Sequence, residues 1–175
     1  MTKISYRILK TEDAENYRNM RLDCLMKFPD NFGSSFTEES QLKSLKLEEI
    51  INSHDEEGFV MGAFEDNHHL IGICGFIKQT RSKTRHRGDL VQLFVNPVYT
   101  GQGIGKQLMQ ETISKAFEQE EIEQITLGVV HSNDAAINLY RQLGFVEYGR
   151  LEKYFKSGND YFTQLFFVLS RPDKI

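Results

Sequence analysis

The sequence predicts a mixed α/β fold, in which helices cover both faces of a central mixed sheet whose strands are mostly antiparallel. Two observations lead to this fold class. Segments of alternating or β-branched apolar residues, typical of strands, are interspersed with segments whose apolar residues recur at helical spacing. In chain order they give β-α-α-β-β-β-α-β-α-β-β, a pattern in which the helices must pack on the faces of a sheet to bury their apolar sides.

The composition indicates one domain over residues 1–175. Of these 175 residues, 39% are hydrophobic and 26% charged, and a chain of this length predicts a single domain. No apolar run approaches the roughly 20 residues of a membrane-spanning helix, and the start of the chain lacks the apolar stretch of a secretory signal. We therefore expect a cytoplasmic protein without a membrane partner. The net charge of −4 also disfavours a nucleic-acid partner.

The first half of the chain predicts one strand, two helices and then three strands. Thr11 can cap the first helix, because its hydroxyl can accept a hydrogen bond from the free N–H groups of the first turn. Leu42, Leu45 and Ile50 are expected to point inward from the second helix. The segments are, in order, a strand over 6–9, a helix from 11 to about 26, a loop over 28–35, a helix over roughly 38–52, and strands over 59–64, 70–79 and 89–95.

The second half predicts two helices, each followed by strands. Turn residues at 157–160 separate the last two strands and indicate a hairpin. The segments are a helix over 104–117, a strand over 124–130, a helix through 136–143, and strands over 145–156 and 161–169. A basic run over 78–87 connects the strands predicted over 70–79 and 89–95. It fits either a solvated hairpin tip or a contact with an acidic partner. Its cations are Lys78, Arg81, Lys83, Arg85 and Arg87.

The strongest chemical signal is the glycine-rich turn Thr100-Gly101-Gln102-Gly103-Ile104-Gly105-Lys106, between a strand and a helix. Glycines at every second position let the backbone approach a ligand, and the N–H groups at a helix start favour an anion. The turn therefore fits a phosphate or pyrophosphate site, although a tight turn that needs positive φ explains the same glycines. A dinucleotide-binding loop would need glycine in place of Lys106, and a Walker loop would need glycine in place of Thr100, so both are excluded.

Two motifs in this order resemble the GCN5-related N-acetyltransferase (GNAT) family. The first joins the strand Leu93-Phe94-Val95 to the turn Gly101–Gly105, and the second runs from Asn133 to Phe145. The resemblance extends to the order of the strands over nearly the whole chain. It implies a GNAT-like acyl-CoA N-acyltransferase fold and an enzyme that moves an acetyl group from acetyl-CoA to an amine.

The resemblance also implies where acetyl-CoA, as co-substrate, would bind. Its pyrophosphate would lie on the backbone amides of the glycine turn, and its pantetheine arm would pair with the preceding strand like an added strand. Asn133 would bond this arm and can also be the N-cap of its helix. Thr100 departs from the family, which usually has Arg or Gln there, so we expect weaker cofactor affinity. The implied cofactor-binding residues are Leu93, Phe94, Val95, Gly101, Gln102, Gly103, Ile104, Gly105, Lys106, Asn133, Ala136 and Tyr140.

Tyr140 is the candidate general acid. A phenol with a pKa of ~10 can protonate the thiolate that leaves from CoA, although helical periodicity alone also fits a core aromatic. Cys74 would allow transfer through an acetyl-cysteine, but its apolar surroundings without an adjacent histidine favour a buried side chain. We expect no metal, because no acidic or histidine set with ligand spacing joins His68 and His69.

Asp89 is the candidate general base, because it stands where histone-type members of the family carry a glutamate. It can act through a water, or it can simply pair with Arg85 or Arg87. His131, just after the fifth strand, is the rival base. The ribosomal-protein N-terminal acetyltransferases carry a glutamate where this chain has Gly128, which counts against that subgroup.

Acceptor selectivity in the family resides in the first helix-loop-helix and the last hairpin, here about 25–36 and 154–162. Aromatic rings with Asp30 and Asp160 suit a cationic amine, although the same rings fit the ends of the core. We expect a small-molecule primary amine; a peptide N-terminus or protein lysine is one alternative, and a non-catalytic acyl-CoA sensor or interaction module is another. A monomer or a homodimer is expected. The candidate substrate-binding residues are Phe28, Phe32, Tyr154 and Tyr161.

Overall fold

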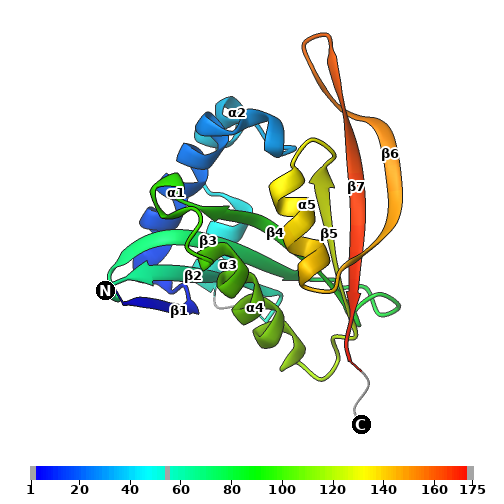
Figure 1. The fold of residues 1–175 in the computed structure, drawn as a ribbon. Coiled ribbons are helices and arrows are strands. Elements are labelled where there is room, and N and C mark those ends of the chain that lie inside the picture. Colours follow the sequence, from blue (N-terminus) through cyan, green and yellow to red (C-terminus); the bar gives the residue numbers. More distant parts are fainter. Residues whose placement is uncertain (1–2, 54–55, 173–175) are drawn as a thin grey trace.

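A computed structural model describes residues 3–53 and 56–172 and contains one seven-stranded sheet in the order β1-β2-β3-β4-β5-β7-β6 (Figure 1). Every neighbouring pair is antiparallel except β4 and β5, which run parallel. The predicted mixed, mostly antiparallel sheet is therefore confirmed. The strands are β1 (Ile4–Ile8), β2 (Gly58–Glu65), β3 (His69–Lys78), β4 (Arg87–Val95), β5 (Gln124–Val130), β6 (Val146–Ser157) and β7 (Asp160–Ser170).

Helices cover both faces of this sheet, as the sequence predicts. Alternation along β3 divides its apolar side chains, so that Ile73 packs into one core and Cys74 into the other. The first core is completed by α1 (Ala14–Lys27) and α3 (Lys46–Ser53), and the second by α4 (Ile104–Phe117) and α5 (Asp134–Gln142). The sheet is thus buried on both faces, between the two pairs of helices.

The prediction of one helix over 38–52 is wrong, because the chain forms two shorter helices, α2 (Phe36–Gln41) and α3. Ser35 caps α2 by accepting a hydrogen bond from the Glu38 N–H, and the extended backbone of Leu42 ends it. Leu42, expected to point inward, is half-exposed, whereas Leu45 is buried. Glu48 accepts from the Leu45 N–H at 3.0 Å, so a new cap starts α3 within the sequence that looked continuous.

The parallel pairing of β4 with β5 ends soon after it begins. It joins only 87–89 to 124–126, after which the two strands diverge (Figure 1). A β-bulge in β4 accounts for the divergence, because Val91 lies opposite Gly75 and Phe94 lies opposite Ile73, leaving an additional residue on β4. Gln92, within the bulge, has a φ of +57°. Beyond Asp89, β4 therefore follows β3 and leaves the β5 side of its backbone without a strand partner.

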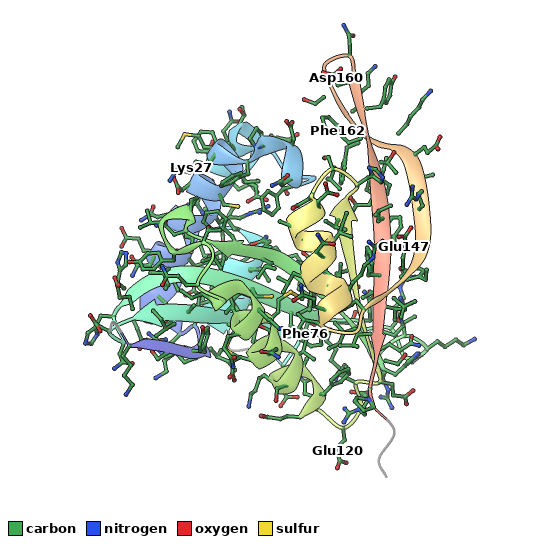
Figure 2. The ribbon with its side chains drawn as sticks, viewed as in Figure 1. Lys27, Phe76, Glu120, Glu147, Asp160 and Phe162 are labelled. Atoms are coloured by element: carbon green, nitrogen blue, oxygen red, sulfur yellow. The ribbon has the colours of Figure 1, made fainter. Side chains whose placement is uncertain are left out.

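The β6–β7 hairpin extends beyond the rest of the sheet, with Asp160 at its outer end (Figure 2). Its turn at 157–160 is where the sequence predicts it. Partway along the hairpin, the ring of Phe155 lies against Gly33, where an added Cβ would be 2.5 Å from Phe155 Cε1. The hairpin therefore packs on the loop between α1 and α2, and Phe155 and Gly33 line one cavity together.

Candidate active site

The glycine-rich turn begins α4 with two residues in the left-handed region. Gly101 has a φ of +82° and Gly103, the N-cap of α4, a φ of +77°. A Cβ at either position would meet no atom within 4 Å, so the backbone conformation and not crowding requires glycine here. The interpretation as a tight turn is therefore confirmed.

The same turn leaves its N–H groups free for a ligand. Among the described residues, the N–H groups of Gly101, Gln102 and Gly103 have no protein acceptor. The N–H groups of the next three residues, 104–106, lie in the first turn of α4, where an N–H group has no acceptor within the helix. No acidic side chain stands in that turn to accept from them. With the helix dipole, these donors favour an anion, so the conformation of the turn is compatible with the phosphate interpretation as well.

A cavity of ≈ 470 Å³ lies beside this turn and brings half of the implied cofactor-binding residues together. We call it the turn-side cavity. Phe28, which the sequence suggests as a residue that binds the acceptor, lines this cavity and not the outer or central one. Its ring centroid is 6.0 Å from that of Phe94. The side chain of Ile104 points into the core, so only its backbone is available to a ligand. The lining includes Leu93, Phe94, Val95, Thr100, Gly105, Asn133 and Ala136.

Asn133 is the N-cap of α5, with its Oδ1 accepting from the Ala136 N–H at 3.2 Å. The N-cap role that the sequence allowed is therefore confirmed. Its side chain also faces the turn-side cavity and a second one of ≈ 480 Å³, the central cavity, which is lined by Arg21, Phe32, Gln92, Asn133 and Tyr140 among others. The start of α5 thus stands where the two cavities meet.

Tyr140 is a core residue that also reaches the central cavity. Its side chain is 8% exposed and packs near the rings of Phe145 and Phe167, with centroids 6.1 and 6.2 Å away. Burial, with a smaller contribution from Cys74, raises the pKa of Tyr140 above the ordinary value of a phenol. Its hydroxyl therefore keeps its proton, and Tyr140 can act as a proton donor but not as a base.

Cys74 lies in the wall of the same cavity but is completely buried. Burial raises the pKa of its thiol to about 12, although a hydrogen bond with Thr112 acts in the opposite direction. A thiol in this state is not a thiolate, the form that attacks a thioester. The geometry therefore agrees with Cys74 as a packing residue.

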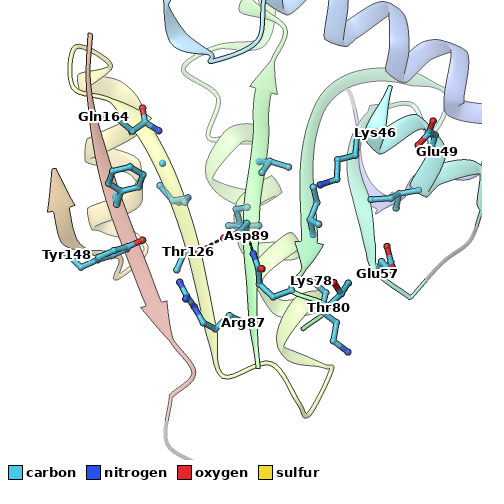
Figure 3. Close-up of a pocket in the computed structure, with 18 of the residues that line it drawn as sticks. Lys46, Glu49, Glu57, Lys78, Thr80, Arg87, Asp89, Thr126, Tyr148 and Gln164 are labelled. Atoms are coloured by element: carbon cyan, nitrogen blue, oxygen red, sulfur yellow. Dashed lines mark hydrogen bonds between the residues drawn. The ribbon is translucent and has the colours of Figure 1, made fainter. Parts of the chain in front are cut away.

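Asp89 stands at the last paired position of β4 and β5, where the two strands begin to separate. Gln79 and the hydroxyl of Thr126 donate hydrogen bonds to its two carboxylate oxygens (Figure 3). The expected partner Arg85 instead forms an ion pair with Glu121 at 2.7 Å. Arg87 forms no ion pair with Asp89 either, so the two carboxylate oxygens accept from neutral donors.

A third space, the outer cavity, has a volume of ≈ 810 Å³ and extends from Asp89 toward the β6–β7 hairpin. Figure 3 shows Lys46, Glu49 and Glu57 on one side of it and Tyr148 and Gln164 on the other. It adjoins the central cavity, since both are lined by Lys46, Val91 and Gly128. Together the two cavities lead from the surface to the place where β4 and β5 diverge.

The four candidate acceptor residues are not all found together. Tyr154 lines the outer cavity, and Phe32 lines the central cavity under the Arg21 guanidinium, 5.1 Å from its ring centroid. Tyr161 lines neither; it lies half-exposed on the hairpin, 5.4 Å from the Nζ atoms of both Lys153 and Lys156.

Three polar residues of the site gave no signal in the sequence. Gln92 and Arg21 line the central cavity, and Gln164 lines both it and the outer cavity. The side chain of Gln164 lies over Gly128. In the orientation in which both of its amide groups find partners, its nitrogen donates to the Val129 C=O and its oxygen accepts from the Val129 N–H, each at 3.2 Å. Each looks like an ordinary helix or strand residue along the chain, because only the folded sheet brings them to one place.

The remaining candidates do not join this site. His131 is exposed, with its backbone N–H bonded to Thr163. The described residues include no group of three or more His, Cys, Asp or Glu that could hold a metal ion. No helix in the part of the chain that the structure describes is long and apolar enough to cross a membrane.

Known proteins with a similar sequence or fold point to one family. The model of the acetyltransferase (GNAT) family matches residues 18–145. Spermidine N(1)-acetyltransferase of Vibrio cholerae is 31% identical over 133 residues, which cover 73% of this chain and 74% of that protein. N-alpha-acetyltransferase 30 of Schizosaccharomyces pombe is 30% identical over 102 residues, which cover 58% of this chain and 67% of that protein.

A structure of the protein yncA from Salmonella typhimurium, with its cofactor acetyl-CoA, has the same fold. Its TM-score is 0.81, and the match covers 99% of this chain and 96% of that one at 15% sequence identity. The family match spans β2 to β5, α4 and α5, which form the turn-side cavity and the junction of β4 and β5, and it ends before the β6–β7 hairpin. The chain therefore belongs to the GNAT family of acetyltransferases and is an acetyl-CoA-dependent N-acetyltransferase.

Proposed function

We propose that this enzyme transfers an acetyl group from acetyl-CoA to a primary amine of a small molecule, by direct attack while both are bound. The observation that carries the proposal is the divergence of β4 and β5 beyond Asp89. Free backbone N–H groups at the start of α4 lie on one side of this opening, and the charged outer cavity leads into it from the other. Donor and acceptor can therefore meet between the strands.

The residues around the turn-side cavity fit the donor. The pyrophosphate would lie on the backbone N–H groups of 101–106, where open space surrounds both left-handed glycines. The pantetheine arm would follow the unpaired side of β4 at Leu93 and Val95, with Asn133 on its other side. When bound, acetyl-CoA supplies an acetyl thioester.

Two side chains of this chain would handle the protons. The amine must be neutral to attack, and Asp89, placed at the mouth of the opening with no cation paired to it, would receive its proton directly or through a water. Tyr140, kept protonated by burial, would give its hydroxyl proton to the departing sulfur. A backbone N–H of β4 near Val95 would hold the thioester carbonyl oxygen.

The outer cavity supports a small polar amine as the acceptor. Glu49, Glu57 and Asp89 line it, and these carboxylates attract a cationic amine. Lys46 and Arg87 line it too, so its charge is mixed, which favours an amine with a second polar or anionic group. The similarity to a protein named spermidine N(1)-acetyltransferase supports a small-molecule amine as the acceptor.

A second candidate acceptor is a peptide N-terminus. It is favoured by the similarity to N-alpha-acetyltransferase 30. Phe155, packed on Gly33, lies in the wall of the central cavity and occupies room that an extended chain would need, so this acceptor stands second.

Thermal unfolding with acetyl-CoA, with NADH and ATP as controls, tests the donor first. A ligand at 100 times its Kd adds about 2.7 kcal/mol of stability, which raises the melting temperature by a few degrees. A shift with acetyl-CoA alone is expected. Thiol release is then followed with three acceptor groups: polyamines, amino acids and their amides, and short peptides. Turnover confined to peptides would replace the first candidate with the second, and no turnover with a positive shift would indicate a binding module.

A further inference from the structure

A buried hydrogen bond links the first helix to the bulge that opens the sheet. The hydroxyl of Tyr17, on α1, donates to Oε1 of Gln92 at 2.7 Å. Tyr17 is 0% exposed, and Gln92 is the residue of β4 with the positive φ of +57°. We propose that Tyr17 is a positioning residue, which holds Gln92 in this conformation and so sets the direction of β4 along the acetyl donor. The proposal rests on the proposed function.

Gln92 needs such an anchor because its conformation is unfavourable by itself. A side chain with a Cβ rarely adopts positive φ, and residues held there cost free energy that the surrounding structure must offset. Beyond Asp89, no β5 residue pairs with β4 to hold it. The bond from Tyr17 supplies a fixed contact at the residue where β4 turns away from β5.

The bond is placed to affect donor binding. Gln92 lines the central cavity, and Leu93, the next residue, lines both this cavity and the turn-side cavity. A change of φ at Gln92 rotates the peptide groups that follow it, so the N–H and C=O groups of Leu93 and Val95 would no longer face the donor in the same direction. Tyr17 itself does not line any of these three cavities and would act only through Gln92.

Packing alone gives Tyr17 another possible role, which must be separated from positioning. It belongs to the core cluster with Cys24, Leu47 and Ile51, where a large ring contributes to stability whatever its hydroxyl does. Burial also raises the pKa of Tyr17 above its ordinary value, so the hydroxyl stays a donor. The variant Tyr17→Phe keeps the ring and removes only this donor.

The test combines Tyr17→Phe with a change at Gln92. Isothermal titration with acetyl-CoA gives the Kd, and hydrogen–deuterium exchange of a peptide covering 91–95 reports the bulge directly. We expect Tyr17→Phe to raise the Kd about fivefold, the scale of one net hydrogen bond, and to speed exchange in 91–95. Glycine adopts positive φ without an anchor, so Tyr17→Phe/Gln92→Gly should recover most of the lost affinity. Ile51→Val, in the same core, controls for general destabilisation.

Each result decides the proposal. Unchanged Kd and unchanged exchange in Tyr17→Phe would overturn it, and so would an equal rise in Kd in Ile51→Val or a failure of Gln92→Gly to recover affinity. If the wild-type protein does not bind acetyl-CoA, the proposed function falls, and the exchange of 91–95 still decides whether Tyr17 holds the bulge.

Discussion

Arg21 and Glu39 form a two-bond ion pair between α1 and α2, in which Nε donates to Oε2 and Nη2 to Oε1, each at 2.9 Å. The Arg21 side chain is 3% exposed and that of Glu39 13%. The pair joins α1 to α2, and Arg21 and nearby Ser34 line the central cavity. A buried pair in this place therefore fixes one wall of the active site.

Glu39→Ala should destabilise the protein by about 3–5 kcal/mol, because it leaves the Arg21 cation buried without a counter-charge. Urea unfolding measures the change. Asp23→Asn is the matched control, since Asp23 and Lys27 form an exposed pair on the same helix, where a loss of about 0–1 kcal/mol is expected. Similar losses in the two variants would contradict a structural role for the buried pair.

Stability should fall in acid through two carboxyl groups. Hydrogen bonds from Arg7 lower the pKa of Asp13 despite burial, which acts in the opposite direction. Burial alone would raise the pKa of Glu39, but hydrogen bonds from Arg21 and Ser34 outweigh it, and the pKa is lowered. Because the folded pKa lies below the unfolded one, this stability is present above the unfolded pKa of about 4 and is lost as pH falls through the folded pKa.

The measurement is urea unfolding of the wild type and of Asp13→Asn and Glu39→Gln at a series of pH values from about 7 to about 3. The wild type should lose more stability across this range than either variant. Curves that stay parallel would show that these two carboxyl groups are not linked to folding.

The sequence predicted the parts of the site that lie close together along the chain. The turn before α4 and the cap of α5 each depend on a few neighbouring residues, such as Gly103 and Asn133, whose conformational preferences are local. The break between α2 and α3 was missed because Leu42 fits a helical pattern, and only its extended backbone and the new cap at Glu48 interrupt the helix there.

The parts that depend on pairing across the sheet were not predictable in this way. The bulge at Gln92 follows from the register of β4 against β3, and alternation along β4 gave no sign of it. Gln164 reaches the site only because β7 lies next to β5, although it comes late in the chain. Side chains from distant segments meet through topology, which a local pattern does not contain.

Tyr140→Phe should lower kcat about a hundredfold or more and leave the Kd for acetyl-CoA nearly unchanged, because it removes the proton donor and keeps the buried ring. Thiol release and titration calorimetry measure the two quantities. Tyr148→Phe, which changes an exposed phenol at the edge of the outer cavity, is the control and should keep the wild-type kcat within a few-fold. A weakened Kd with normal turnover of the bound complex would remove Tyr140 as the acid.

Gly103→Val should weaken acetyl-CoA binding strongly, since valine resists a φ of +77° and its side chain would stand in the open space over the turn. Gly158→Val is the matched control, because Gly158 also has positive φ (+59°) and open space around it but lies in the β6–β7 turn. Both variants should lose a similar ~1–2 kcal/mol of stability from backbone strain. Normal affinity in a folded Gly103→Val protein would refute the anion site.

Asp89→Asn should lower kcat by a factor that depends on pH. If Asp89 accepts the proton of the amine, its loss matters most where the acceptor arrives protonated. As pH rises toward ~10, the range in which alkyl amines lose their proton, more acceptor arrives neutral and the defect should shrink. Thr126→Val removes one of the hydrogen bonds to Asp89 but keeps the carboxylate, so its smaller defect should not depend on pH in this way. A constant defect in Asp89→Asn at every pH would assign Asp89 to holding the junction of β4 and β5 instead of to proton transfer.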